Sequence, residues 1–191
     1  MLKPASQMAQ DLLSDAWAWD FPASDWERDV VAELLDLPIY DIPRLPADEV
    51  ARMGMLPNAC HANVRRCVES NPGMAIATGW VIERPDFMLH SVLQTGDRQF
   101  ICVTPSAAGE TGFVPFMPDA KISWAVRGQE YAPVRNGRMI EGPGVRQHPA
   151  FTIAKFKIIR ERLGRGVPVE EAITFTRDEF ETLRQAHIPK A

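Results

Sequence analysis

The sequence has few cysteines, no basic excess and no long hydrophobic run. Three cysteines are too few for a disulfide framework, and the first residues lack the basic-then-apolar layout of a signal peptide. We therefore expect a cytoplasmic chain with free thiols. Because 25 acidic residues outnumber 21 basic ones, we expect no nucleic-acid partner. The apolar runs are too short to cross a bilayer, so we expect no membrane association.

Glycine-rich phosphate loops are also absent after the expected strands, which argues against nucleotide binding through the usual loop motifs. The length of 191 residues and the 46% hydrophobic content are ordinary for one globular domain, 1–191. Within it we expect a helical part (1–56), a cysteine-bearing helix with an antiparallel sheet (57–141), and C-terminal helices (142–191). Strands grouped together rather than alternating with helices predict the α+β class.

Local signals place the elements. Ser24 with Glu27 predicts a capping box that opens a helix, and Asn58 predicts the N-cap of another helix that ends near Ser70. Three strand-like segments follow, at 74–83, 87–94 and 99–104, and short turn sequences between them predict an antiparallel meander.

The remainder of the chain continues with one more strand, a hairpin and helices. Residues 122–126 are strand-like, and Asn136-Gly137 predicts a tight β-hairpin. Apolar residues from Phe151 to Leu163 recur at helical spacing. Thr176, followed by glutamate three residues later, predicts the cap of a last helix.

Cys60 falls in the first turn of the helix that Asn58 would cap. Unpaired backbone N–H groups and the positive end of the helix dipole favour a thiolate at such a position. Cys60, Val64 and Cys67 share one helix face, which we expect to pack on the sheet with Cys67 in the core.

His90 lies in the middle of the second expected strand, between apolar residues. A buried imidazole needs partners for its ring nitrogens, and a sulfur from a helix packed on the sheet is a suitable partner. Thiol chemistry needs such a base beside the sulfur and a third group that orients the base. Cys60 and His90 are therefore the candidate catalytic residues.

Several short segments in this region share a recognisable order. They are Cys60-His61-Ala62-Asn63, Gly79-Trp80, His90-Ser91-Val92, Val103-Thr104-Pro105 and Phe116-Met117-Pro118-Asp119. The order of helix cysteine, strand histidine and a polar residue on the next strand resembles papain-like folds, including the bacterial NlpC/P60 peptidases. More locally, the segments resemble small bacterial and phage proteins with C-H-x-N, G-W, H-[AS]-V, D-[VI]-T-P and F-x-P-D patterns. The resemblance covers residues 58–120.

The resemblance implies a papain-like α+β fold and a cysteine hydrolase or acyltransferase without a cofactor. Cys60 would be the nucleophile and His90 the general base, acting on an amide or ester bond of a peptide or small-molecule substrate. The family pattern has an aspartate where this sequence has Cys102, and a thiol does not orient an imidazole as a carboxylate does. The residues that could orient or support the site instead are Thr104, Asn63, His61 and Asp119; otherwise the site works as a dyad or has lost its activity.

Other interpretations use the same residues. The chain could be a non-catalytic binding module for a protein partner, which Cys102 in place of the acid favours, with the N- and C-terminal helices as the recognition surface. Cys60 and His90 could also be packed core residues. Cys60, His90 and Cys102 are also zinc-type ligands, although no close pair of ligands supports a metal site. A redox disulfide between Cys60 and Cys102 is a further alternative.

Overall fold

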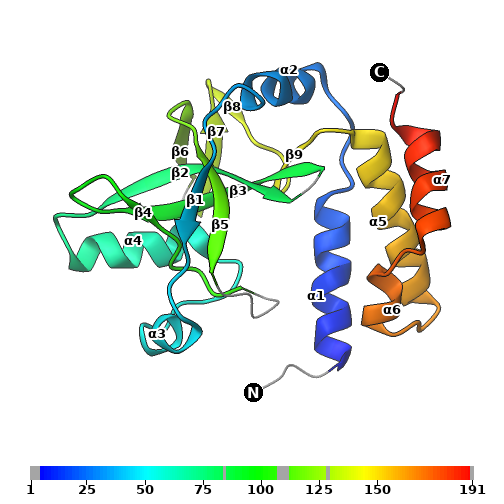
Figure 1. Cartoon of the computed structure of the whole chain (residues 1–191), viewed down its shortest axis with the longest axis horizontal. Coiled ribbons are helices and arrows are strands. Elements are labelled where there is room, and N and C mark those ends of the chain that lie inside the picture. The colour runs from blue at the N-terminus through cyan, green and yellow to red at the C-terminus, as the bar shows by residue number, and fades with distance from the viewer. Residues whose placement is uncertain (1–4, 84, 107–111, 128–129, 190–191) are drawn as a thin grey trace. The chain divides into compact units, whose positions relative to one another are not determined.

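The computed structural model describes residues 5–83, 85–106, 112–127 and 130–189. It combines helices with antiparallel sheets, which confirms the α+β class (Figure 1). The chain forms two compact units: one comprises the described residues up to Val31 and from Glu141 on, the other Ala32–Ile140. Among the described helices, none combines the length and the apolar character that spanning a membrane requires.

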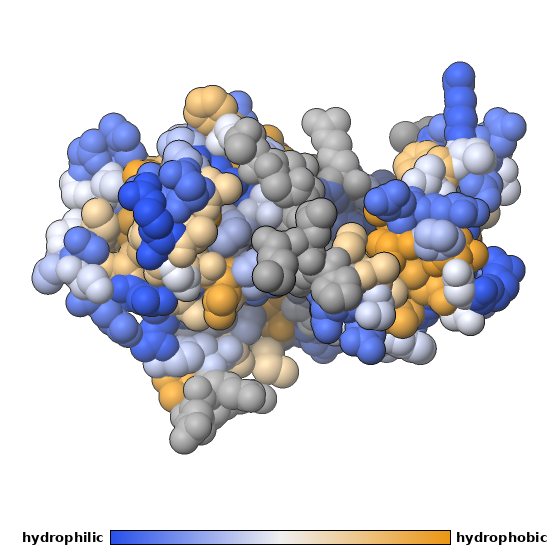
Figure 2. Space-filling model, turned by 90° about the horizontal axis from the view of Figure 1, so that it is seen from below, coloured by the Kyte–Doolittle hydropathy of each residue, from blue (hydrophilic) through white to orange (hydrophobic). Residues whose placement is uncertain are grey.

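The first unit is mainly helical. Its elements are α1 (Ala5–Ala18), the first part of α2 (Asp25–Leu34), β9 (Gly144–Arg146), α5 (Pro149–Gly164), α6 (Val169–Ile173) and α7 (Arg177–His187). Helices α1 and α7 both pack against α5. Thr176 and Glu179 form the predicted capping box at the start of α7. Hydrophobic residues gather on the surface of this unit's helices (Figure 2), and the exposed ones include Trp17 and Ile173.

A buried arginine joins the two ends of the sequence within this unit. The Arg146 guanidinium donates to both carboxylate oxygens of Glu27 at 2.8 Å and to the backbone carbonyls of Trp19 and Phe21. The predicted capping box at α2 is therefore only half present. The Glu27 N–H donates to Ser24 Oγ, but the Glu27 carboxylate binds Arg146 instead of returning to the cap.

The second unit contains the sheet that carries the candidate site. Its strands are β1 (Tyr40–Pro43), β2 (Ala75–Glu83), β3 (Asp86–Gln94), β4 (Phe100–Ile101) and β5 (Phe113–Pro118). They lie in the order β1-β5-β2-β3-β4, and every neighbouring pair is antiparallel. The predicted β2–β3–β4 meander is confirmed. Strands β1 and β5 were not predicted, because each contains proline, which normally marks a turn or a sheet edge.

The two edges of this sheet meet after β4. Cys102 forms a parallel bridge with Arg44: its N–H donates to Pro43 O, and its carbonyl accepts the Leu45 N–H, both at 2.9 Å. This contact brings the segment after β4 back against the end of β1. The Cys102 side chain is fully buried.

A smaller sheet and two helices complete the second unit. The sheet contains β6 (Ile122–Arg127), β7 (Glu130–Arg135) and β8 (Arg138–Met139), and the helices are α3 (Ala47–Arg52) and α4 (Cys60–Ser70). Asn136 and Gly137 have φ values of 50° and 79°, which confirms the predicted hairpin between β7 and β8.

The main sheet has a different core cluster on each face. Helix α4 lies along β3, and Val64 and Cys67 pack there with Leu93, which confirms the core position of Cys67. The other cluster contains Val92 and Cys102. Because side chains alternate along a strand, His90 shares the face of Val92 and lies with Cys102 rather than under α4.

Candidate functional site

Helix α4 begins at Cys60, but Asn58 does not cap it. The N-cap residue is Ala59, which supplies no side-chain hydrogen bond, and Asn58 has a left-handed φ of 57°. The segment before the helix is held by Asn63 instead. Its carboxamide accepts the Leu56 N–H at 3.0 Å and donates to the Leu56 carbonyl at 2.8 Å. The prediction of Asn58 as N-cap was wrong because a side chain in the next helical turn satisfies this loop.

The sulfur of Cys60 lies beside the backbone of β3. The backbone N–H groups of Ser91, His61 and Cys60 itself lie near it and act to lower its pKa. Burial acts in the opposite direction and is the largest effect, so the pKa of the Cys60 thiol is raised. The expected thiolate is thus not the favoured form: burial outweighs the helix N-terminus, and Cys60 is a neutral thiol at neutral pH.

His90 and Cys102 are in direct contact. Nε2 of His90 lies 3.3 Å from Cys102 Sγ, and the Cys102 thiol is also placed to donate to the Thr104 carbonyl at 3.8 Å. Burial, with a smaller effect from Arg44, lowers the pKa of His90 to about 4. Burial raises the pKa of Cys102. The imidazole and the thiol are therefore both uncharged at neutral pH.

Cys60 approaches this pair from the edge of β3. Its sulfur lies near the N–H of Ser91, the residue after His90, and a negative charge on the Cys102 sulfur would raise the Cys60 pKa. Among the described residues, the hydrogen bonds join His90 to Cys102, and none joins Cys60 Sγ to the imidazole. Because Nε2 is occupied by Cys102, Nδ1 is the ring nitrogen that remains for a second partner.

His61 belongs to a separate chain of hydrogen bonds through Ser91. His61 Nδ1 lies 3.2 Å from Ser91 Oγ, which lies 3.3 Å from Thr78 Oγ1, and Thr78 accepts the Trp124 indole N–H at 3.1 Å. The rings of His61 and Trp124 stack, with centroids 3.6 Å apart. Burial, and then the charge of Arg65, lowers the pKa of His61 to about 4.

Sequence reasoning missed Ser91 and Trp124 as site residues. Ser91 is fully buried in β3, and a buried hydroxyl is a signal that a polar partner is present. Trp124 carried no comparable signal, because an aromatic residue is ordinary in a strand.

The structure places Asn63 and Thr104 together. Asn63 Nδ2 donates to Thr104 Oγ1 at 3.3 Å, and both residues are buried. Their side chains therefore tie the start of α4 to the segment after β4, and neither contacts the imidazole through a hydrogen bond that the described part of the chain forms. Thr104 contributes to the His90 pair through its backbone carbonyl, which faces the Cys102 thiol.

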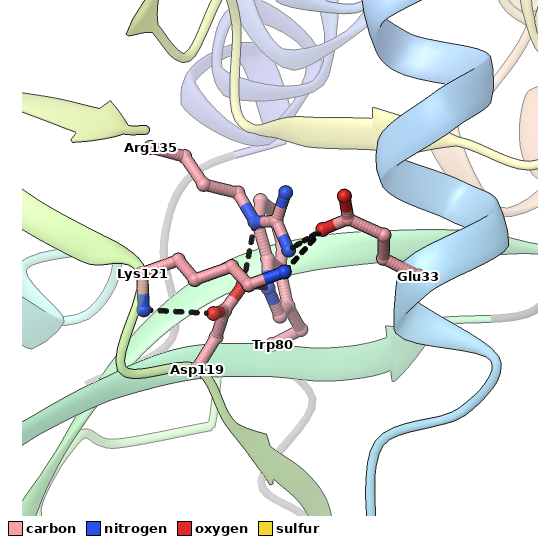
Figure 3. Close-up of polar contacts among 5 residues, drawn as sticks. All are labelled: Glu33, Trp80, Asp119, Lys121 and Arg135. Atoms are coloured by element: carbon pink, nitrogen blue, oxygen red, sulfur yellow. Dashed lines mark hydrogen bonds and ion pairs between the residues drawn. The ribbon is translucent and has the colours of Figure 1, made fainter. Parts of the chain in front are cut away.

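Asp119 lies in a different network (Figure 3). Its carboxylate accepts hydrogen bonds from Trp80 Nε1 at 2.9 Å, Arg135 Nε at 2.7 Å and the Lys121 N–H at 3.0 Å. Arg135 and Lys121 also reach the Glu33 carboxylate, at 2.6 and 2.8 Å. Both oxygens of Asp119 are therefore bound by groups other than His90, and the orienting role considered for it finds no support in this geometry.

The recognised segments thus contact one another in space. The start of α4 binds Ser91 and Thr104, while Trp80 binds Asp119. Position 79 requires glycine, because a Cβ there would lie 2.0 Å from the Met117 carbonyl oxygen of β5. Their order in the sequence reflects a set of contacts that hold α4, β2, β3 and β5 together.

Metal binding gains no support from the side chains. Among the residues that the structure describes, no group of three or more His, Cys, Asp or Glu side chains is arranged to hold a metal ion. The three cysteines are all free thiols.

Comparisons of the chain with protein-family models, with curated proteins and with solved structures found no match. The resemblance to papain-like and NlpC/P60 proteins therefore stays a prediction.

Proposed function

We propose that the protein is a papain-like cysteine hydrolase or acyltransferase that acts on an amide or ester bond. The observation that carries the proposal is the position of Cys60, which begins α4 and whose sulfur lies near the N–H of the residue next to His90. Thiol acyl transfer requires a base within reach of the nucleophile, and His90 is the candidate base next to the residue that the Cys60 sulfur faces. Three free thiols suit a reducing compartment, so we place the activity in the cytoplasm.

The charge states define the mechanism. With Cys60 protonated and His90 neutral at pH 7, the reaction starts from a thiol and an imidazole rather than an ion pair. Nδ1 of His90 takes the thiol proton as Sγ bonds to the carbonyl carbon, and the imidazolium then protonates the leaving amine or alcohol. Water or an acceptor alcohol, deprotonated by the same ring, releases the acyl group and restores the thiol.

Cys102 takes the orienting position in this proposal. For Nδ1 to accept a proton, Nε2 must carry one, and that N–H points at Cys102 Sγ while the Cys102 thiol donates to Thr104 O. Sulfur is a weak acceptor, so it selects the tautomer without stabilising an imidazolium as a carboxylate would. We therefore infer a slow enzyme, or one whose natural substrate is an activated ester or thioester.

Acylation by p-nitrophenyl acetate tests the proposal. Wild-type protein should release p-nitrophenolate in a burst and carry one acetyl group on the Cys60 peptide by mass spectrometry. The variants C60S and H90N should reduce the burst at least 100-fold, since each removes one member of the pair. The C67S variant is the matched control, because Cys67 lies on the same helix but in the core, and it should retain the burst. Equal acetylation of Cys60 and Cys67, or a burst that survives H90N, would contradict the mechanism.

Replacement of Cys102 by aspartate sharpens the test. A carboxylate at this position would stabilise the imidazolium and raise the pKa of His90, so the burst rate should increase and its pH midpoint should rise. The isosteric variant C102S is the control and should change both quantities little. An unchanged pH midpoint in C102D would show that position 102 does not orient the base.

A non-catalytic binding module for a protein partner is the second candidate. The observation that favours it is the raised pKa of Cys60, since a protonated thiol is a poor nucleophile. If this candidate is correct, the folded protein should give no ester burst at any pH between 6 and 9. The C60S variant should then leave partner binding unchanged.

A further inference from the structure

The second unit contains a pocket of about 370 Å³ whose lining includes His61 at the start of α4. It runs along the Ile76–Thr78 part of β2, beyond the pair of Gly79 with Pro118 that ends the β2–β5 ladder. His61, the residue after Cys60, and Trp124 form part of its wall. Because their rings stack and hydrogen bonds through Ser91 and Thr78 tie them to β3 and β2, this wall is pre-formed.

The lining of the pocket selects for an uncharged group. Its walls are apolar and aromatic, with Ile76, Phe100, Pro118 and Ile122 among the lining residues. No lysine or arginine lies among the described residues that line it, so it offers no cation to a carboxylate or phosphate. The acidic residue that lines it, Asp119, is already neutralised by Arg135.

Polar groups in the lining are mostly committed to the protein. Thr78 already bonds to Trp124 and Ser91, and His61 uses Nδ1 for Ser91. The neutral His61 ring keeps its other nitrogen, and the Gln94 side chain also lines the pocket. These groups suit a single amide or ester function at the end of an apolar group.

We infer that this pocket is the acyl subsite of the proposed enzyme and binds an uncharged aliphatic or aromatic group attached to the carbonyl that Cys60 attacks. The inference rests on the proposed function, since it uses Cys60 as the nucleophile. It adds a substrate class: uncharged apolar acyl groups rather than acidic, basic or phosphorylated ones. The volume suits a medium-sized acyl chain or an aromatic amino-acid side chain.

Two p-nitrophenyl esters, the acetate and the hexanoate, test the subsite. Wild-type Cys60 should react at least tenfold faster with the hexanoate, because its added methylenes are buried in the pocket. The variant A120F places a ring at a pocket-lining residue in an exposed turn, and it should reduce the hexanoate-to-acetate rate ratio to about one. The control A51F, at an exposed position on α3, should keep both rates. Equal rates for the two esters in wild type, or an advantage that survives A120F in a folded protein, would overturn the subsite.

A binding measurement separates failure of the subsite from failure of the proposed function. If neither ester acylates Cys60, the hydrolase proposal fails, and the pocket is tested with the neutral probe N-acetyl-phenylalaninamide by intrinsic tryptophan fluorescence. Saturable binding that A120F weakens at least fivefold, and that A51F preserves, would retain the pocket as a site for uncharged apolar groups. Absence of saturable binding would overturn it.

Discussion

Two regions of the second unit bury ionisable groups. One region holds oppositely charged side chains in ion pairs, and the other holds uncharged groups. Around Asp119, Arg135 is 2% exposed and forms ion pairs with two carboxylates. Around His90, the buried groups are an imidazole and thiols without a carboxylate partner, and burial shifts each pKa toward the neutral form. A buried group keeps its charge when a counter-charge is buried with it and otherwise becomes neutral.

This difference separates a structural role from a chemical one. The Asp119 network binds Trp80 from β2, Arg135 from β7 and, through Arg135, Glu33 from α2, so it joins elements far apart in the sequence (Figure 3). The His90 region contains a neutral base and neutral thiols, which are the states from which proton transfer can start.

The largest expected effect comes from removing the buried arginine of the Asp119 network. Replacing Arg135 by methionine keeps much of the volume but leaves Asp119 buried without its cation. We expect a loss of about 3–5 kcal/mol in the free energy of unfolding, measured by urea denaturation. Lys121→Met is the control: this lysine is half exposed and should cost about 1 kcal/mol or less. Equal losses in the two variants would refute the view that the buried pair is the critical part of the network.

A methyl group added between the two regions should have the next largest effect. Gly79 pairs with His90 on one side and with Pro118 on the other. In Gly79→Ala the new Cβ meets backbone atoms of Met117 and Pro118, which cannot turn away as a flexible side chain would. We expect a loss of about 2–3 kcal/mol in unfolding free energy. Gly73→Ala, where a Cβ meets nothing within 4 Å, should change it by about 0.5 kcal/mol or less. A tolerated Gly79→Ala would show that β5 can move away from β2.

The smallest effect should be a pH dependence of stability that originates in the His90 region. A pKa lowered to about 4 means that the unfolded chain binds a proton at His90 below about pH 6.5, while the folded chain does not until about pH 4. Stability should therefore fall by about 1–3 kcal/mol as the pH drops through this window. His90→Asn should remove this part of the slope, and His61→Asn a further part, because its pKa is also lowered to about 4. Urea denaturation at several pH values measures the slope.

The ion pairs of Glu33 should lose their contribution to stability at a lower pH than the His90 region does. The pKa of the Glu33 carboxyl is lowered by its hydrogen bonds to Lys121 and Arg135, so its stabilising effect persists above its ordinary pKa of 4.5 and is lost as the pH falls below it.

If His90→Asn left the slope between pH 6.5 and 4 unchanged, the proposed neutral state of the imidazole would be wrong.

Local signals in the sequence were sufficient to predict much of the secondary structure. The β2–β3–β4 meander, the hairpin at Asn136 and the cap at Thr176 were predicted, because each depends on residues close together in the chain. Strands β1 and β5 were missed, since their pairing partners are distant and their prolines suggested turns. The cap at Asn58 failed for a related reason: Asn63 satisfies the same loop from within the helix.

For the candidate site, the sequence by itself determined which residues carry chemistry: a cysteine at a helix start, a histidine inside a strand and a thiol where the related pattern has an acid. Only the tertiary structure decided their partners and charges. It paired His90 with Cys102, directed Asp119 to Arg135, and buried Cys60 enough to raise its pKa. The physical reason is that a pKa depends on desolvation and on charges brought together by packing, and neither is encoded in the spacing of residues along the chain.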